Sequence, residues 1–99
     1  MKIRIYYDST DAGGIVYHTE YIKFCEQARS EIFFKNGIFF ENEGYVVTNL
    51  NAKFLSSAKL GDIIEIKTKV LNISKIKVEI LQEICKENKK IFELNIKLA

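Results

Sequence analysis

The amino-acid sequence predicts an α+β fold in which one five-stranded, mostly antiparallel sheet wraps around one long helix. One stretch near the N-terminus repeats apolar residues every three or four positions, which is the period of a helix buried on one side. Four later segments alternate apolar and polar residues, which is the period of strands with one buried and one wet face. A length of 99 residues suits a single domain, residues 1–99.

The expected elements follow one another as strand, helix and four strands. We expect the first strand at residues 2–7 and the helix at about residues 19–36, with His18 or Thr19 as its cap and Asn36-Gly37 as its end. The apolar stripe of the helix consists of Tyr21, Cys25, Ala28 and Ile32, widened by Ile22, Phe24 and Phe33. The later strands are expected at 45–54, 63–70, 75–84 and 91–98, with turns at 61–62, 72–74 and 87–88. In the strand at 75–84, the core-facing residues would be Ile76, Val78, Ile80 and Ile84.

Composition and charge argue against several classes of protein. The net charge is only +2 and the lysines are spread along the chain, whereas nucleic-acid binders concentrate positive charge. Lys75 and Lys77 are expected on a solvated strand face. No apolar run approaches 18 residues, so no integral membrane span is expected, and the first four residues lack the apolar core of a signal peptide. Cys25 and Cys85 match no zinc or redox motif, which favours buried thiols in a reducing, cytoplasmic setting.

The loop between the first strand and the helix carries the residues most informative about function. From Asp8 to His18 it contains two carboxylates, the only histidine and the pair Gly13-Gly14. The first N–H groups of a helix have no partner within the helix and carry partial positive charge, so they can stabilise an oxyanion. A carboxylate nearby can act as a base or as a nucleophile. These are the minimal parts for transferring an acyl group to water.

An ordered run of these residues resembles the signature of the 4-hydroxybenzoyl-CoA thioesterase-like family. The run is Asp11-Ala12-Gly13-Gly14-Ile15-Val16-Tyr17-His18, followed by Tyr21, Phe24, Glu26, Ala28 and Arg29. It is most similar to the acyl-CoA thioesterase branch associated with the bacterial Tol–Pal system, and a weaker match continues through Phe54, Ala58, Gly61 and Asp62. The resemblance implies the hotdog fold, homodimers that often pair into homotetramers, and active sites at subunit interfaces. It also implies hydrolysis of acyl-CoA without a metal or an organic cofactor.

Carried over to this chain, the resemblance assigns a role to each residue of the motif. It makes Asp11 the catalytic carboxylate and the backbone N–H of His18 the donor to the oxyanion. It places the site's lining at Tyr7, Gly14, Val16 and Tyr17, together with the His18 side chain. The family usually carries Glu-Asp-Thr-Asp where this chain has Asp8-Ser9-Thr10-Asp11, so the outer acid is kept while its neighbour is not.

Several alternatives use the same residues differently. An aspartate before glycines often only shapes a turn by bonding its own backbone. A Cys25 nucleophile is disfavoured, because two helical turns, about 10 Å, separate it from His18. A Ser-His-Asp triad lacks its G-x-S-x-G motif. A metal site built from Asp8, Asp11, His18 and Glu20 follows no recognised ligand spacing.

Two alternatives concern the ligand rather than the loop. The main alternative to a thioesterase is a hotdog module that holds an acyl group, on coenzyme A or on acyl carrier protein, without cleaving it. A hotdog dehydratase would need a histidine and an acid placed differently. Five aromatic residues either pack in the core or border an acyl channel: Phe33, Phe34, Phe39, Phe40 and Tyr45.

Overall fold

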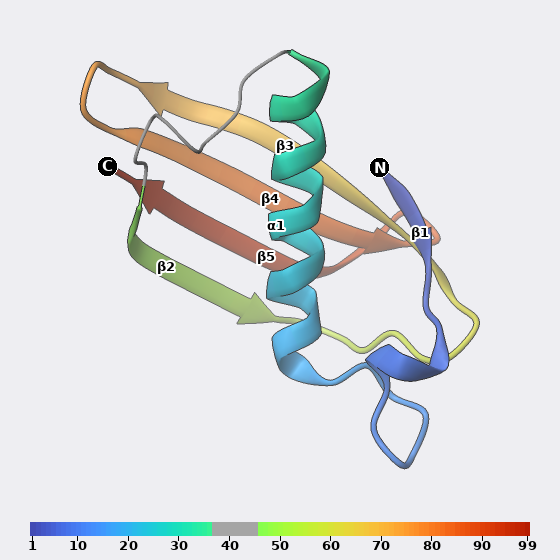
Figure 1. The fold of residues 1–99 in the computed structure, drawn as a ribbon. Helices are drawn as coiled ribbons and strands as arrows, with labels where there is room; N and C mark the ends of the chain where they lie inside the picture. The colour runs from blue at the N-terminus through green and yellow to red at the C-terminus, as the bar shows by residue number, and fades with distance from the viewer. Residues whose placement is uncertain (37–45) are drawn as a thin grey trace.

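The computed structural model, which describes residues 1–36 and 46–99, contains one sheet and one long helix (Figure 1). The elements are β1 (Lys2–Arg4), a 3-10 helix (Tyr7–Ser9), α1 (His18–Lys35), β2 (Val47–Phe54), β3 (Ile63–Ile73), β4 (Val78–Lys86) and β5 (Lys89–Leu98). The strand order is β1-β3-β4-β5-β2, and each neighbouring pair is antiparallel. The predicted succession of one strand, one helix and four strands is confirmed.

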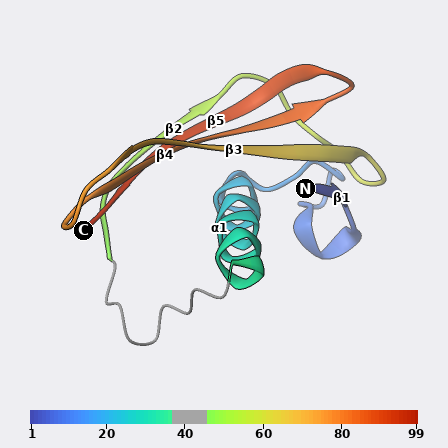
Figure 2. The ribbon, with the colours of Figure 1, turned by 90° about the horizontal axis from the view of Figure 1, so that it is seen from above.

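The sheet curves over α1, which lies against its concave face (Figure 2). The core forms there, because the period of two sends alternate residues of each strand toward the helix. In β5 these are Phe92, Leu94, Ile96 and Leu98, all buried as predicted. The helix contributes Tyr21, Phe24, Cys25 and Ala28, whereas Ile32, predicted as part of the buried stripe, is largely exposed.

Two of the predicted turns are confirmed by their backbone angles. Glu87 and Asn88, between β4 and β5, have φ values of 51° and 65°, the left-handed pair that suits a two-residue hairpin. Gly61 has φ of 87°, a conformation that favours glycine.

The start of the chain departs from the prediction in two places. The first strand ends at Arg4, and a 3-10 helix follows, since Thr10 bonds the carbonyl of Tyr7 through both its backbone N–H (3.1 Å) and its hydroxyl (2.8 Å). Local bonds of this kind compete with strand pairing. The helix cap is Tyr17, which forms no side-chain cap bond, so the prediction of His18 or Thr19 as the cap was wrong.

The turn between β3 and β4 also lies later than predicted. Residues 72 and 73 belong to β3, and the turn runs from Ser74 to Lys77 because the Ser74 hydroxyl accepts the N–H of Lys77 at 3.1 Å. Ile76, predicted to face the core, is therefore exposed at the turn. The predictions for Gly37, Phe39, Phe40 and Tyr45 lie outside the described residues. No helix in the described ranges is long and apolar enough to cross a membrane.

Candidate active site

The loop before α1 folds back on itself as a small antiparallel hairpin. Thr10 pairs with Val16, and the N–H of Asp11 donates to the carbonyl of Ile15 at 2.9 Å. The turn closes when the Gly14 N–H donates to the Asp11 carbonyl at 3.0 Å. Gly14 has φ of 78°, a conformation that costs other residues about 1–2 kcal/mol. The hairpin places Asp11 and the first turn of α1 at the same end of the molecule.

The Asp11 carboxylate shapes this turn with one of its two oxygens. Its Oδ1 accepts hydrogen bonds from the N–H groups of Gly13 (2.9 Å) and Ile15 (3.2 Å). A Cβ at position 13 would lie 3.3 Å from Oδ1, so glycine leaves room for the carboxylate. Asp11 is exposed, and no hydrogen bond to its Oδ2 is found within residues 1–36 and 46–99. The turn-shaping role is therefore real, and it leaves one oxygen facing outward.

His18 is the first residue of α1 and carries the N–H group predicted to bind an oxyanion. In the described part of the chain this N–H has no hydrogen-bond partner, as is usual for the first turn of a helix. The exposed imidazole lies with its centroid 4.5 Å from the ring of Tyr17 and 6.3 Å from that of Phe54. No hydrogen bond joins His18 to Asp11, so the two groups would meet only through a bound substrate.

A second loop, residues 55–62, supports the first through backbone hydrogen bonds. The Val16 N–H donates to the Ala58 carbonyl at 3.0 Å, and the Leu60 N–H donates to the Gly14 carbonyl at 2.9 Å. The Tyr21 hydroxyl of α1 accepts the Ala58 N–H at 2.9 Å. The motif from Asp11 to Arg29 assigns this loop no role, and only the weaker match through Ala58, Gly61 and Asp62 pointed to it.

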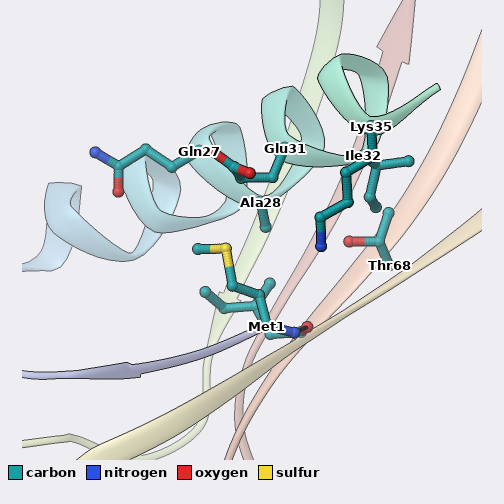
Figure 3. Close-up of a pocket in the computed structure, with 8 residues that line it drawn as sticks. Met1, Gln27, Ala28, Glu31, Ile32, Lys35 and Thr68 are labelled. Atoms are coloured by element: carbon teal, nitrogen blue, oxygen red, sulfur yellow. Dashed lines mark hydrogen bonds between the residues drawn. The ribbon is translucent and has the colours of Figure 1, made fainter. Parts of the chain in front are cut away.

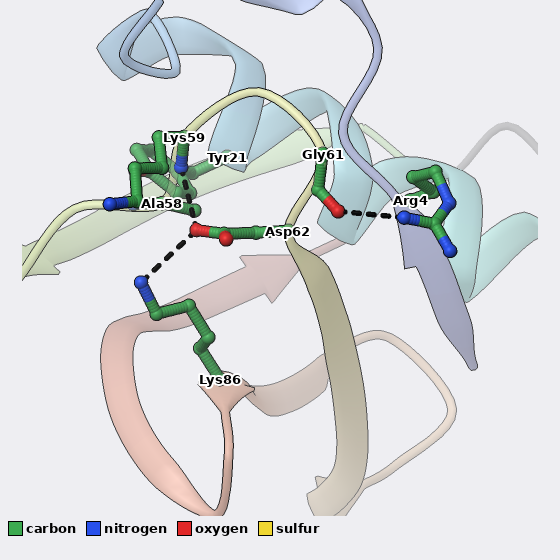
Figure 4. A network of polar contacts seen from close by, with 7 residues as sticks. All are labelled: Arg4, Tyr21, Ala58, Lys59, Gly61, Asp62 and Lys86. Atoms are coloured by element: carbon green, nitrogen blue, oxygen red, sulfur yellow. Dashed lines mark hydrogen bonds and ion pairs between the residues drawn. The ribbon is translucent and has the colours of Figure 1, made fainter.

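Asp62 fixes the second loop to the sheet (Figure 4). Its Oδ2 accepts the Lys59 N–H at 2.9 Å and pairs with the Lys86 ammonium at 3.0 Å. Partial burial alone would raise the pKa of Asp62, but the Lys59 bond and the Lys86 charge outweigh burial and lower that pKa. On the other side of the loop, the Arg4 guanidinium donates to the Gly61 carbonyl at 2.8 Å.

The predicted lining residues differ in how they meet solvent. Tyr7 and Tyr17 expose most of their rings, and Gly14 is partly covered. Val16, in contrast, is buried and belongs to the core cluster, so its side chain is not on the surface of the single chain. The loop thus presents Asp11, two tyrosines and the helix start together.

The rival chemistries find no support in the described residues. Cys25 is fully buried, and burial raises the pKa of its thiol to about 12, only partly opposed by the charge of Arg29. A thiol that stays protonated is a poor nucleophile. Within residues 1–36 and 46–99, no three His, Cys, Asp or Glu side chains gather in a way that could hold a metal ion.

Two of the cavities that the described residues form beside α1 lie on opposite sides of the helix. One, of about 600 Å³, lies between the helix and β3, where Met1, Gln27, Glu31, Lys35 and Thr68 converge (Figure 3). The other, of about 410 Å³, runs along the β2 side of the helix, with Ile22, Arg29 and Phe33 on the helix and Val47 and Leu50 on the strand. Because Ile22 is one turn after His18, the second cavity is the one that begins near the candidate site.

Comparisons with known proteins agree with this geometry. Residues 13–92 match the family model described as "Thioesterase superfamily". A Helicobacter pylori protein named acyl-CoA thioesterase YbgC is 44% identical over 91 residues, which cover 89% of this chain and 68% of that relative. This match confirms the similarity to the acyl-CoA thioesterase branch that residues 11–29 indicated.

Solved structures share the whole fold. A probable thioesterase from Bartonella henselae superposes with a TM-score of 0.90 at 25% identity, covering 100% of this chain and 87% of the other. A 1,4-dihydroxy-2-naphthoyl-CoA thioesterase from Synechocystis superposes with a TM-score of 0.92 at 15% identity, covering 100% and 78%. The shared arrangement is the hotdog fold that the resemblance implied. This chain is therefore a member of the thioesterase superfamily.

Proposed function

We propose that this chain hydrolyses acyl-CoA thioesters to a free acid and coenzyme A, with Asp11 as the catalytic carboxylate. The observation that carries the proposal is that, among the described residues, the Oδ2 of the exposed Asp11 and the N–H of His18 both lack a hydrogen-bond partner, and both lie where the loop leads into α1. The name of the Helicobacter pylori relative, acyl-CoA thioesterase, supports the same substrate class.

Hydrolysis adds water across the carbonyl carbon–sulfur bond, and two routes use the same carboxylate. In one, Asp11 takes a proton from water as the water attacks the carbonyl. In the other, Asp11 attacks the carbonyl itself, and water then opens the acyl-aspartyl anhydride. Either way the thiolate leaves and gains a proton. The His18 N–H would donate to the oxyanion, a contribution typically on the order of 10²–10³ in rate.

The substrate would lie between the loop and the β2 side of the helix. The exposed rings of Tyr7 and Tyr17 and the backbone at Gly14 would border the thioester. The acyl chain would enter the cavity that begins at Ile22 and reaches Phe33, one of the aromatics expected either to pack in the core or to border an acyl channel. An acyl group delivered on acyl carrier protein would present the same thioester to these residues.

A second copy of the chain would complete this site. β2 is an edge strand, paired on one side with β5, and its apolar residues Val47, Leu50 and Phe54 are exposed in the single chain. An uncovered apolar edge of this kind favours association. We therefore propose a homodimer, or a tetramer of two such dimers, acting in the cytoplasm, where the two free, buried cysteines would stay reduced.

The decisive experiment measures thiol release from a panel of acyl-CoAs by wild type and Asp11→Asn. Asparagine keeps an oxygen that can accept the Gly13 and Ile15 N–H groups, so the turn should survive while the carboxylate is lost. We expect kcat to fall on the order of 10²–10⁴. Glu20→Gln is the matched control, because it removes an acid in the first turn of α1 that pairs with Lys23.

Two results would contradict the proposal in different ways. Release that is equal in wild type and Asp11→Asn would remove Asp11 from the chemistry. A wild-type protein that binds acyl-CoA in calorimetry but releases no thiol from any substrate would be the non-catalytic binding module.

A further inference from the structure

We propose that the turn joining β3 and β4 docks this protein on the surface of an anionic lipid bilayer. The docking element, called here the hairpin tip, comprises residues 69–77, and every one of these residues is exposed. It lies at the end of the sheet opposite the loop that carries Asp11 (Figure 1). The proposal does not depend on the catalytic role of Asp11.

The hairpin tip exposes large apolar side chains. Ile73 and Ile76 are 71% and 70% exposed, and Val70 and Leu71 are also uncovered. A single exposed isoleucine is ordinary, because much of any protein surface is apolar. Four such residues lie within seven positions, three at the end of β3 and one in the turn, and clusters of exposed apolar residues mark contacts with partners or membranes.

Positive charge surrounds the same patch. Lys67, Lys69, Lys75 and Lys77 lie in and beside the hairpin tip, and no acidic residue occurs from position 66 to position 78. The chain as a whole carries +2, so these four lysines leave the rest of it at −2 (+2 minus +4). These four lysines therefore surround the two most exposed isoleucines of the described residues, Ile73 and Ile76.

This combination fits an anionic bilayer better than a protein groove. Apolar side chains that enter the headgroup region, ringed by lysines that contact anionic headgroups, are the pattern by which proteins lie on membranes. Each lysine near such a surface strengthens binding by about 1 kcal/mol, which is roughly fivefold. The hairpin tip also protrudes, so it can enter the headgroup region of a bilayer without movement of the surrounding protein.

The turn holds its apex in one shape before any contact is made. The Ser74 N–H donates to the Lys77 carbonyl at 2.8 Å, and the Ser74 hydroxyl accepts the N–H groups of Lys77 (3.1 Å) and Ile76 (3.4 Å). These bonds fix Ile76 at the tip, so little conformational entropy would be lost on binding.

The test is sedimentation of the full-length protein with lipid vesicles at low salt. Vesicles of equal parts phosphatidylglycerol and phosphatidylcholine are compared with vesicles of phosphatidylcholine alone. We expect binding to the anionic vesicles, weakened by added salt because salt screens the lysines.

Lys75→Gln/Lys77→Gln should lower the partition coefficient roughly twentyfold. Ile73→Ser/Ile76→Ser should lower it at least about tenfold, because two apolar insertions are lost.

Matched controls separate the hairpin tip from general charge. Lys2→Gln/Lys89→Gln removes two exposed lysines at the other end of the sheet, in β1 and beside the turn between β4 and β5, and should change binding little. The unfolding curve verifies that each variant is folded. If the wild type releases thiol from dissolved acyl-CoA, the same assay gives a second check of each variant. Equal loss in the control, or no binding of wild type to anionic vesicles, would overturn the proposal. So would a change of oligomeric state in Ile73→Ser/Ile76→Ser, which would make the patch a contact between copies.

Discussion

The loop end of the molecule and the interior of the sheet are stabilised in different ways. At the loop end, residues 8–17 and 55–62 are joined mainly by backbone hydrogen bonds, such as those from Val16 to Ala58 and from Leu60 to Gly14. In the interior, apolar side chains fill the space between α1 and the sheet. Side-chain hydrogen bonds also cross that interior: the Arg29 guanidinium donates to the Gln82 amide oxygen at 2.7 Å, and the Gln82 amide donates to the Cys25 carbonyl at 2.9 Å.

This difference explains where chemistry can be located on so small a chain. A loop held by its backbone leaves its side chains exposed, as Asp11, Tyr17 and His18 are, so they can change their contacts when substrate binds. In the interior, the side chains are engaged in packing, so none of them is available to contact a substrate. We therefore expect loop substitutions to alter turnover and interior substitutions to alter stability.

The largest effect on stability is expected from substituting one of two neighbouring phenylalanines, one in the interior of the sheet and one nearer the loop end. The rings of Phe92 and Phe54 are 5.0 Å apart, but Phe92 is fully buried and Phe54 is 49% exposed. Phe92→Ala should reduce the free energy of unfolding by about 3–5 kcal/mol, because it opens a cavity in the core. Phe54→Ala should reduce it by about 1 kcal/mol. Urea unfolding monitored by circular dichroism gives both values.

Turnover should respond in the opposite order. Phe54 lies 6.3 Å from the His18 ring, so Phe54→Ala should slow thiol release while the chain stays folded. Equal destabilisation by the two substitutions would contradict the division, since it would mean that Phe54 is as firmly packed as Phe92.

An intermediate effect is expected from the polar network inside the core. Gln82 is fully buried; it accepts from Arg29 and donates to the Cys25 carbonyl at 2.9 Å and the Thr68 hydroxyl at 3.0 Å. Gln82→Leu would leave the buried guanidinium without its acceptor and should destabilise the fold by about 2–3 kcal/mol. Arg29 is only 9% exposed, and this burial lowers the pKa of its guanidinium.

The double variant Arg29→Met/Gln82→Leu separates loss of the bond from loss of packing. Replacing both partners by apolar residues removes the stranded charge, so most of the stability should return. The measurement is a double-mutant cycle of unfolding free energies. A double variant less stable than Gln82→Leu would show that Arg29 stabilises the fold through contacts other than this bond.

The sequence predicts the fold well where one period repeats along an element. β5 is the clearest case: Phe92, Leu94, Ile96 and Leu98 alternate without interruption, and all four are buried. The motif also predicts that Asp11 lies beside the start of the helix, but seven positions of loop can extend over about 20 Å or more, so sequence separation alone does not bring them together. The resemblance then supplies the chemistry that local patterns leave open.

Other features depend on contacts that no local pattern carries. Gln82 occupies a core-facing position of β4, yet a glutamine there gives no hint that Arg29, 53 positions away, is its partner. The two hydrogen bonds that join residues 55–62 to the loop before α1 run between backbone atoms, so side-chain types give no sign of them. The turn between β3 and β4 lies later than predicted, because the Ser74 hydroxyl accepts the N–H groups of Ile76 and Lys77. This shift leaves Ile76 exposed at the turn.

The smallest expected effect belongs to the ion pair that fixes the second loop. Asp62 and Lys86 are partly solvated, so Asp62→Asn should cost at most about 1 kcal/mol of unfolding free energy at neutral pH.

The pKa of Asp62 is lower in the folded chain than in the unfolded chain, where it is about 3.9. The stabilisation from the Asp62 carboxylate is therefore complete above the unfolded pKa and is lost as the pH falls through the folded pKa. The stability difference between wild type and Asp62→Asn should therefore be constant near neutrality and vanish in acid. Asp8→Asn, at an exposed carboxylate that accepts no hydrogen bond from the described residues, is the control substitution. An Asp62→Asn difference that persists unchanged in acid would assign the effect to the shape of the loop and not to the charge.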